Sequence, residues 1–206
     1  MLPEMSDKSA DIESVARKAL EDEELLAELI DGLMSNKETF RYNCFKVLLH
    51  ISEQHGEVLY PMWDRFAALL SSDNAYRKLS GIPIIANLTG VDSENKFGEI
   101  FNAYYGLLDD KSMIVAIYAA ADSGRIVRAK PELEARITKR LLAIDKTHHV
   151  PGRKALVKAG AIEAFDEYFD EAGDRDGIIR FVTEQLDSES PKTRKLARSF
   201  LQKWQK

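Results

Sequence analysis

The sequence is poor in the residues that cross-link or interrupt a chain: its 206 residues include one cysteine, 6 prolines and 11 glycines. Cys44 alone cannot form an internal disulfide, so nothing points to an oxidising compartment. The longest strictly apolar run, Met113–Ala121, is far shorter than the roughly 20 residues of a membrane helix. The first residues, Met1–Glu4, are acidic where a signal peptide is basic. We therefore expect a cytoplasmic protein without a membrane segment.

Signatures of catalysis and of metal or cofactor binding are also missing. The sequence has no Gly-x-x-x-x-Gly-Lys phosphate loop, no Gly-x-Ser-x-Gly elbow and no His-Glu-x-x-His pair. Cys44 falls on the apolar stripe of its predicted helix, which favours a buried thiol over a nucleophile. His50 and His55 have no acid or thiol at metal spacing, and the adjacent His148 and His149 would point in different directions. We expect no enzyme, no cofactor and no metal site.

The apolar residues recur with the period of an α-helix. Between residues 40 and 51 they fall at i, i+4, i+7, i+8 and i+11, at positions Phe40, Cys44, Val47, Leu48 and Ile51. Sustained two-residue alternation, which would indicate strands, is missing. The pattern predicts an all-α protein.

A repeat of about 37 residues organises these helices. Each repeat has an apolar helix, a short polar turn and a second helix with an anchor position in its first turn. The anchors are Arg41, Arg77, Val115, Arg153 and Arg194, with steps of 36, 38, 38 and 41 residues. A single helix pair cannot bury its apolar stripe, so neighbouring pairs must stack. The sequence predicts a right-handed α-α superhelix (solenoid) of about five antiparallel helix pairs.

The predicted boundaries follow from this repeat. We expect a flexible segment over residues 1–10 and a single repeat domain over residues 11–206. The approximate repeats cover residues 24–56, 57–92, 95–129, 131–171 and 175–206.

Local signals predict where some helices begin. Ser35-x-x-Glu38 is typical of a capping box, Asp73 of an N-cap, and Ser190-Pro191 of an N-cap followed by proline. Gly160 and Gly173 divide the segment after Arg153, so an additional helix is expected over about 161–171.

The segment 187–201, Asp-Ser-Glu-Ser-Pro-Lys-Thr-Arg-Lys-Leu-Ala-Arg-Ser-Phe-Leu, resembles the turn and second helix of a HEAT repeat, and residues 72–79 are similar. The likeness extends over roughly residues 24–204, although the period is slightly short and Val115 replaces the basic anchor. The resemblance implies an armadillo-like helical stack. Enzymes of this type provide no match: the His-Glu pairs of deoxyhypusine hydroxylases are missing, and Trp63, Asp64 and Arg65, which resemble the residues of alkylpurine DNA glycosylases, would diverge on one helix.

Charge is unevenly distributed along the chain. Residues 125–158 carry a net charge of +7 and residues 191–206 of +6, although the whole chain carries −5. In a stack, equivalent second helices lie side by side. We therefore expect one basic cluster, which is Arg153, Lys154, Lys158, Arg194, Lys195 and Arg198. The anchor arginines are expected to brace their turns against the neighbouring repeat; they are Arg41, Arg77, Arg153 and Arg194. The other cations, Lys154, Lys158, Lys195 and Arg198, are expected to be either solvated or in contact with a partner.

Two functions remain open from the sequence. The first is a non-enzymatic HEAT-like scaffold or adaptor that binds another protein, possibly through an acidic segment, on its concave surface. The alternative is a nucleic-acid-associated module that uses the basic cluster. The oligomeric state and the role of the His148-His149 loop are not readable from the sequence.

Overall fold

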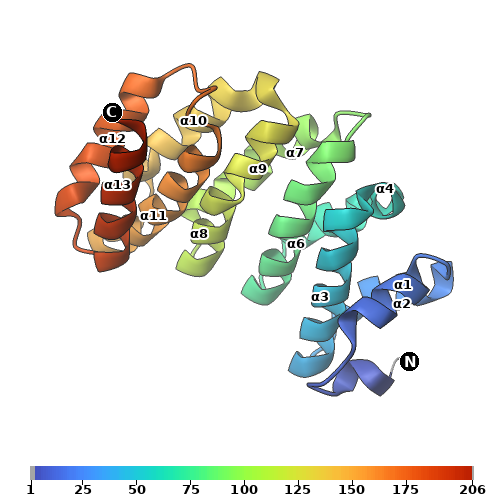
Figure 1. The fold of residues 1–206 in the computed structure, drawn as a ribbon. Coiled ribbons are helices and arrows are strands. Elements are labelled where there is room, and N and C mark those ends of the chain that lie inside the picture. Colours follow the sequence, from blue (N-terminus) through green and yellow to red (C-terminus); the bar gives the residue numbers. More distant parts are fainter. Residues whose placement is uncertain (1–2, 206) are drawn as a thin grey trace. The chain divides into compact units, whose positions relative to one another are not determined.

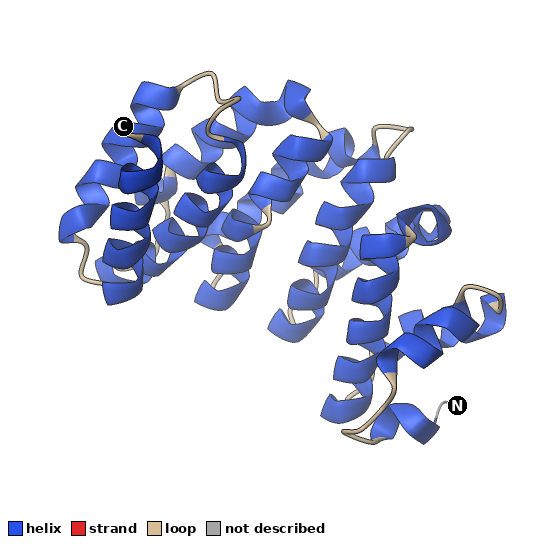
Figure 2. Ribbon diagram, viewed as in Figure 1, coloured by secondary structure: helices blue, strands red, loops and turns tan. Residues whose placement is uncertain are grey.

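The computed structural model describes residues 3–205 as helices joined by short turns (Figure 2). No strand occurs among these residues, so the prediction of an all-α protein is confirmed. In the described part of the chain, no helix is long and apolar enough to cross a membrane. The contacts divide the chain into two compact units, residues 1–96 (unit 1) and 97–206 (unit 2), where the sequence predicts one domain.

Unit 1 contains two packed helix pairs and a preceding short helix (Figure 1). Its elements are η1 (Pro3–Ser6), α1 (Ile12–Ala19), α2 (Glu23–Gly32), α3 (Glu38–Gln54), α4 (Gly56–Leu59), η2 (Tyr60–Met62), α5 (Trp63–Leu70), α6 (Ala75–Leu88) and η3 (Thr89–Val91). Helix α2 packs on α3, α5 packs on α6, and the second helices α3 and α6 contact each other. The fully buried side chains of Leu29, Leu48 and Phe66 belong to this core, so the predicted apolar stripes face inward.

The N-terminal segment of unit 1 is attached to α3. Met5 is fully buried, and the side-chain amide of Asn43 donates hydrogen bonds to the carbonyls of Met5 and Asp7 at 3.0 and 2.7 Å. The sequence predicts a flexible segment over residues 1–10, of which residues 1 and 2 lie outside the described part. Residues 5–7 are held on α3, where the sequence predicts flexibility, because the Met5 side chain is buried and the buried Asn43 amide binds their carbonyls.

Unit 2 is also built from packed helices. Its elements are α7 (Lys96–Gly106, beginning at the last residue of unit 1), η4 (Leu107–Asp109), α8 (Met113–Ala121), α9 (Ser123–Ala129), η5 (Pro131–Leu133), α10 (Glu134–Leu142), η6 (Ile144–Lys146), α11 (Pro151–Tyr168), α12 (Arg175–Glu184), η7 (Gln185–Asp187) and α13 (Pro191–Trp204). Helix α11 packs between α8 and α13, and α10 packs on α11 and α12 (Figure 1). The second helices of unit 2 therefore lie side by side.

The prediction of an additional helix over 161–171 is wrong, because α11 runs without a break from Pro151 to Tyr168. Gly160 lies within this helix, where a Cβ atom would sit 2.6 Å from the carbonyl oxygen of Ile117 in α8. The glycine therefore lets two helix backbones approach closely, and it does not end the helix.

Two of the three predicted helix starts are displaced. Helix α3 begins at Glu38 after Lys37, and Ser35 accepts a hydrogen bond from the Lys37 amide at 3.1 Å, so the capping box does not form. Asn74, and not Asp73, caps α6 by accepting from the Tyr76 amide at 2.9 Å. The third start is confirmed, since Ser190 caps α13 and Pro191 is its first residue.

Candidate functional site

Two anchor arginines close the turn that precedes their own helix. The Arg41 guanidinium donates to the Ser35 carbonyl at 2.9 Å, and Arg194 donates to the Ser188 carbonyl, in both cases six residues earlier. Arg194 also reaches the Glu189 carbonyl at 3.1 Å. These bonds supply donors to backbone carbonyl groups of the turns between helices. Arg194, one of the six residues of the basic cluster, therefore acts first as a turn brace.

The turn before Val115 has no arginine, and a histidine from the next turn closes it. Asp109, six residues before Val115, accepts hydrogen bonds from the His148 backbone amide at 2.6 Å and pairs with the His148 ring. The Nε2 atom of His149 lies 3.1 Å from the Leu108 carbonyl. Burial opposes ionisation of Asp109, but the bonds from His148 outweigh it and lower the pKa of this carboxyl group. The His148-His149 loop thus connects two turns of unit 2.

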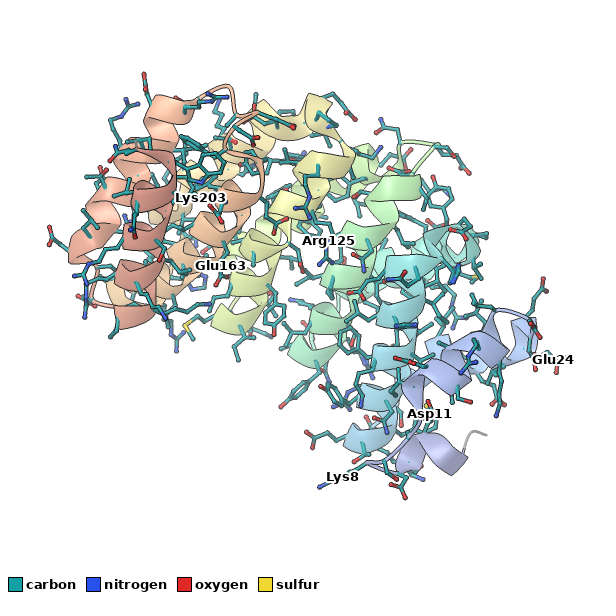
Figure 3. All side chains as sticks on the ribbon, in the orientation of Figure 1. Lys8, Asp11, Glu24, Arg125, Glu163 and Lys203 are labelled. Carbon is teal, nitrogen blue, oxygen red and sulfur yellow. The ribbon has the colours of Figure 1, made fainter. Side chains whose placement is uncertain are left out.

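The basic cluster extends over the packed helices α11 and α13. The Thr193 hydroxyl donates to the Ala155 carbonyl at 2.7 Å, which joins the first turns of the two helices. Further along, Lys192 pairs with Glu163 at 2.8 Å and Lys203 with Asp166 at 2.9 Å. Figure 3 labels Glu163 of α11 and Lys203 of α13. One buried hydroxyl and two largely exposed ion pairs therefore connect these two helices.

Two lysines of the basic cluster contact Asp145, a neighbour that the sequence did not indicate. The Lys154 ammonium donates to the Asp145 carbonyl at 2.7 Å, and the Lys158 ammonium lies 2.9 Å from the Asp145 carboxylate. The Lys158 side chain is only 11% exposed. A groove of about 340 Å³ beside them is lined by Asp187 and Glu189 as well as by the two lysines. Because both lysines already have a partner in Asp145, this groove is not a dedicated anion site.

Three residues of the basic cluster remain open to solvent. Arg153, Lys195 and Arg198 are exposed, and none of their side chains forms a hydrogen bond or ion pair with another residue that the structure describes. Arg153 lies in the first turn of α11, and the other two are three residues apart on α13. These three cations are the part of the cluster that is available to a partner.

The aromatic rings of α13 are not available to stack on nucleic-acid bases. Phe200 is 2% exposed, and Trp204 donates from its indole nitrogen to Asp166 at 2.7 Å while packing on Phe169. Stacking requires an open ring face. The aromatic residues of α13 are thus committed to the fold.

The second helices carry exposed aromatic and apolar side chains that the sequence analysis missed. Tyr42 and Tyr76 are 57% and 61% exposed in unit 1, and Ile114 and Tyr118 are each 49% exposed in unit 2. Arg41 lies over the Tyr76 ring at 5.1 Å. Their positions in the sequence could have indicated them, because each of these side chains falls within three residues of a repeat anchor.

The Cys44 thiol and the side chains of residues 63–65 are not arranged as a catalytic site. Burial raises the pKa of the Cys44 thiol to about 12, which suppresses the thiolate form. Trp63 is 1% exposed, whereas Asp64 and Arg65 are exposed, so these three side chains do not converge. Among the residues that the structure describes, no group of three or more His, Cys, Asp or Glu side chains is arranged to hold a metal ion.

Comparison with known proteins supports the fold alone. No protein-family model matches the chain, and no curated protein sequence matches it. A designed armadillo repeat protein, YIII(Dq)4CqI, is similar in structure, with a TM-score of 0.53 and 15% sequence identity. The match covers 98% of this chain and 99% of the designed chain. The chain therefore has an armadillo-like helical repeat fold.

Proposed function

We propose that this chain is a non-enzymatic scaffold, located in the cytoplasm, that binds an acidic segment of a partner protein on the surface of its second helices. The observation that carries the proposal is the set of three exposed cations, Arg153, Lys195 and Arg198, without partners among the described residues. Lys154, Lys158 and Arg194 border them and have internal partners. The armadillo-like fold agrees with this proposal, since helical repeats present extended binding surfaces.

Affinity at such a surface depends on charge and on apolar contacts together. Exposed cations steer an acidic partner and fix its position, but each exposed ion pair stabilises a complex by only about 0.2–1 kcal/mol. Exposed rings supply the apolar contacts that bind more strongly. Tyr118 of α8, in the same unit, is the exposed ring of this kind. A partner segment with carboxylates and an apolar side chain would use both.

The test is fluorescence anisotropy with a labelled poly-glutamate 20-mer at low and moderate salt. We expect saturable binding at low salt that weakens as salt rises. Reversing all three charges (R153E, K195E and R198E) should weaken binding at least about tenfold. Lys111→Glu is the matched control, because Lys111 is exposed and has no partner among the described residues. Absence of binding at low salt, or equal binding by the triple variant, would refute the proposal.

A nucleic-acid-associated module is the alternative, because the same cations can contact phosphates. Labelled single- and double-stranded DNA and RNA in the same assay separate the two functions. Binding to duplex DNA through three phosphate contacts would give a log–log salt slope near −2.7, at about 0.9 per contact. In α13, the buried Phe200 and the hydrogen-bonded Trp204 offer no open ring face, so stacking on bases would depend on Tyr118 of α8, and we favour the protein partner.

A further inference from the structure

A second concave feature of unit 2 lies between α10 and the turn that precedes α12. It has a volume of about 520 Å³, within the range of small-molecule sites. Ala135, Lys139, Leu142 and Lys146 line one wall. Their spacing of four, three and four residues places them on one face of α10 and its continuation. The wall therefore combines two apolar side chains with two lysines. We call this feature the α10 groove, and it shares no residue with the basic cluster.

The two lysines of the α10 groove are not used by the fold. Lys139 and Lys146 are exposed, and neither side chain forms an ion pair or hydrogen bond with another residue in the described part of the chain. The other cations of α10 have contacts: Arg140 donates to Asn102 at 2.7 Å, and Arg136 lies over the Phe101 ring at 4.0 Å. Unused cations thus coincide with the groove.

The two acidic side chains of the groove, by contrast, are hydrogen-bonded within the protein. Glu134 accepts from the Thr138 hydroxyl at 2.8 Å and from the Gly173 amide at 3.3 Å. Asp174 caps α12 by accepting from the Gly177 amide at 2.9 Å. An anion is repelled by the Glu134–Asp174 side and attracted to the lysines, because like charges repel and opposite charges attract. The apolar part of the same molecule would then lie along Ala135 and Leu142.

We propose that the α10 groove binds a small organic anion that consists of a carboxylate on an apolar body. The carboxylate lies between the ammonium groups of Lys139 and Lys146, where charge-assisted hydrogen bonds are available. The apolar body covers the Leu142 side chain, which is half-buried and forms part of the wall. The site is open to solvent, so its affinity depends on salt.

The probe is 4-phenylbutyrate, titrated into the labelled full chain and followed by two-dimensional ¹H–¹⁵N NMR. The Gly173 amide lies in the groove and donates to Glu134, so its resonance reports occupancy. We expect saturable shifts at Gly173, Lys139 and Lys146 with a dissociation constant in about the millimolar range for a ligand of this size. The uncharged analogue 4-phenylbutan-1-ol should bind at least about fivefold more weakly.

Variants assign the binding to the two lysines. The double variant K139Q/K146Q should lose at least about fivefold in affinity while keeping a dispersed spectrum. Lys111→Gln is the matched control, and the triple variant R153E/K195E/R198E should bind 4-phenylbutyrate as the unaltered chain does. This last result separates the α10 groove from the proposed partner surface.

Three outcomes would overturn the proposal. The first is that 4-phenylbutyrate produces no saturable shift at Gly173 at low salt. The second is equal binding of the acid and the alcohol, which would leave no role for the lysines. The third is binding of a capped Phe-Glu dipeptide in the absence of binding by 4-phenylbutyrate, which would indicate a docking site for a protein segment.

Discussion

In unit 1, the turn before α3 is closed from within its own repeat by Arg41, which reaches the Ser35 carbonyl. In unit 2, α8 has the buried Val115 at the anchor position in place of an arginine. His148 of the following turn donates to Asp109, which lies in the turn before α8. The same structural requirement, closure of the turn within a helix pair, is thus met by different residues from different parts of the chain. A substitution at a repeat anchor therefore does not identify a weak repeat.

The interiors of the two units differ as well. The buried Asn43 amide of unit 1 donates to two carbonyls. In unit 2, the Oη atoms of Tyr104 and Tyr105 and the Oδ2 atom of Asp122 are buried without a hydrogen-bond partner among the described residues. Buried polar atoms without partners each cost about 1–3 kcal/mol. The stability of unit 2 is accordingly more open to improvement.

The largest expected effect concerns the close contact of α11 with α8. In Gly160→Ala, the new Cβ atom would lie 2.6 Å from the Ile117 carbonyl oxygen and 3.2 Å from the Ala121 amide nitrogen. We expect a loss of about 2–4 kcal/mol in the free energy of unfolding, measured by urea denaturation. Gly106→Ala is the control, because no neighbouring atom lies within 4 Å of the place that its Cβ would take. Similar behaviour of the two variants would disprove the close-contact role.

A second prediction concerns the buried carboxyl group of unit 2. Burial raises the pKa of Asp122 to about 6; Arg125 opposes the shift and Glu167 adds to it. The carboxyl group is protonated in both states below about pH 4, and between about pH 4 and 6 the folded state retains a proton that the unfolded state loses. Its ionisation therefore removes up to about 3 kcal/mol of stability as the pH rises through 6.

Asp122→Asn should remove this penalty. We expect the variant to be about 2 kcal/mol more stable than the unaltered chain at pH 7.5 and to differ little from it near pH 4, as measured by urea denaturation at both pH values. Hydrogen exchange of the Ser123 and Tyr104 amides would localise the gain to unit 2. A stability difference that does not change with pH would contradict the assignment.

The arginine braces should have a smaller effect. Arg41→Ala and Arg194→Ala each remove hydrogen bonds to turn carbonyls, and we expect a loss of about 1 kcal/mol in the unit that contains the change. Hydrogen exchange that compares the two units would show which one is weakened. Lysine at either position, which retains the charge but lacks the forked geometry, should recover only part of the loss.

The smallest expected effect is at the bridge between turns. His148→Ala should cost about 0.5 kcal/mol, because the His148 side chain is 95% exposed. Hydrogen bonds from His148 lower the pKa of Asp109, so the stability from this carboxylate is lost as the pH falls through its folded value, below 3.8. In His148→Ala, the measured pKa of Asp109 should rise. Because the variant keeps the backbone bond from residue 148, an unchanged pKa would show that the His148 ring does not act on Asp109.

The sequence predicted the helical fold better than the candidate site. Apolar periodicity places the helix pairs, because burial of one stripe is a property of the local pattern. Helix starts were displaced by one or two residues where several polar side chains compete to cap, as at Asp73 and Asn74. Gly160 was misinterpreted because a close contact between helices looks the same in sequence as a helix end.

The basic cluster shows why side-chain pairing is harder to predict. The charges of Lys154 and Lys158 are evident in the sequence, but their contacts depend on Asp145, which approaches from the preceding turn. The groove beside α10 depends in the same way on Gly173, which is distant from α10 in the sequence. Contacts between turns are set by tertiary packing, and composition does not reveal them.

The bridge from His148 to Asp109 bears on the exchange of repeats. In an array whose repeats close their own turns, one helix pair can be deleted or duplicated, and its neighbours keep every bond at their ends. Here, deletion of residues 131–171 would also remove the group that closes the turn at Leu107–Asp110. The third and fourth helix pairs are therefore coupled, and we expect a deletion or duplication to be tolerated better when it includes both pairs.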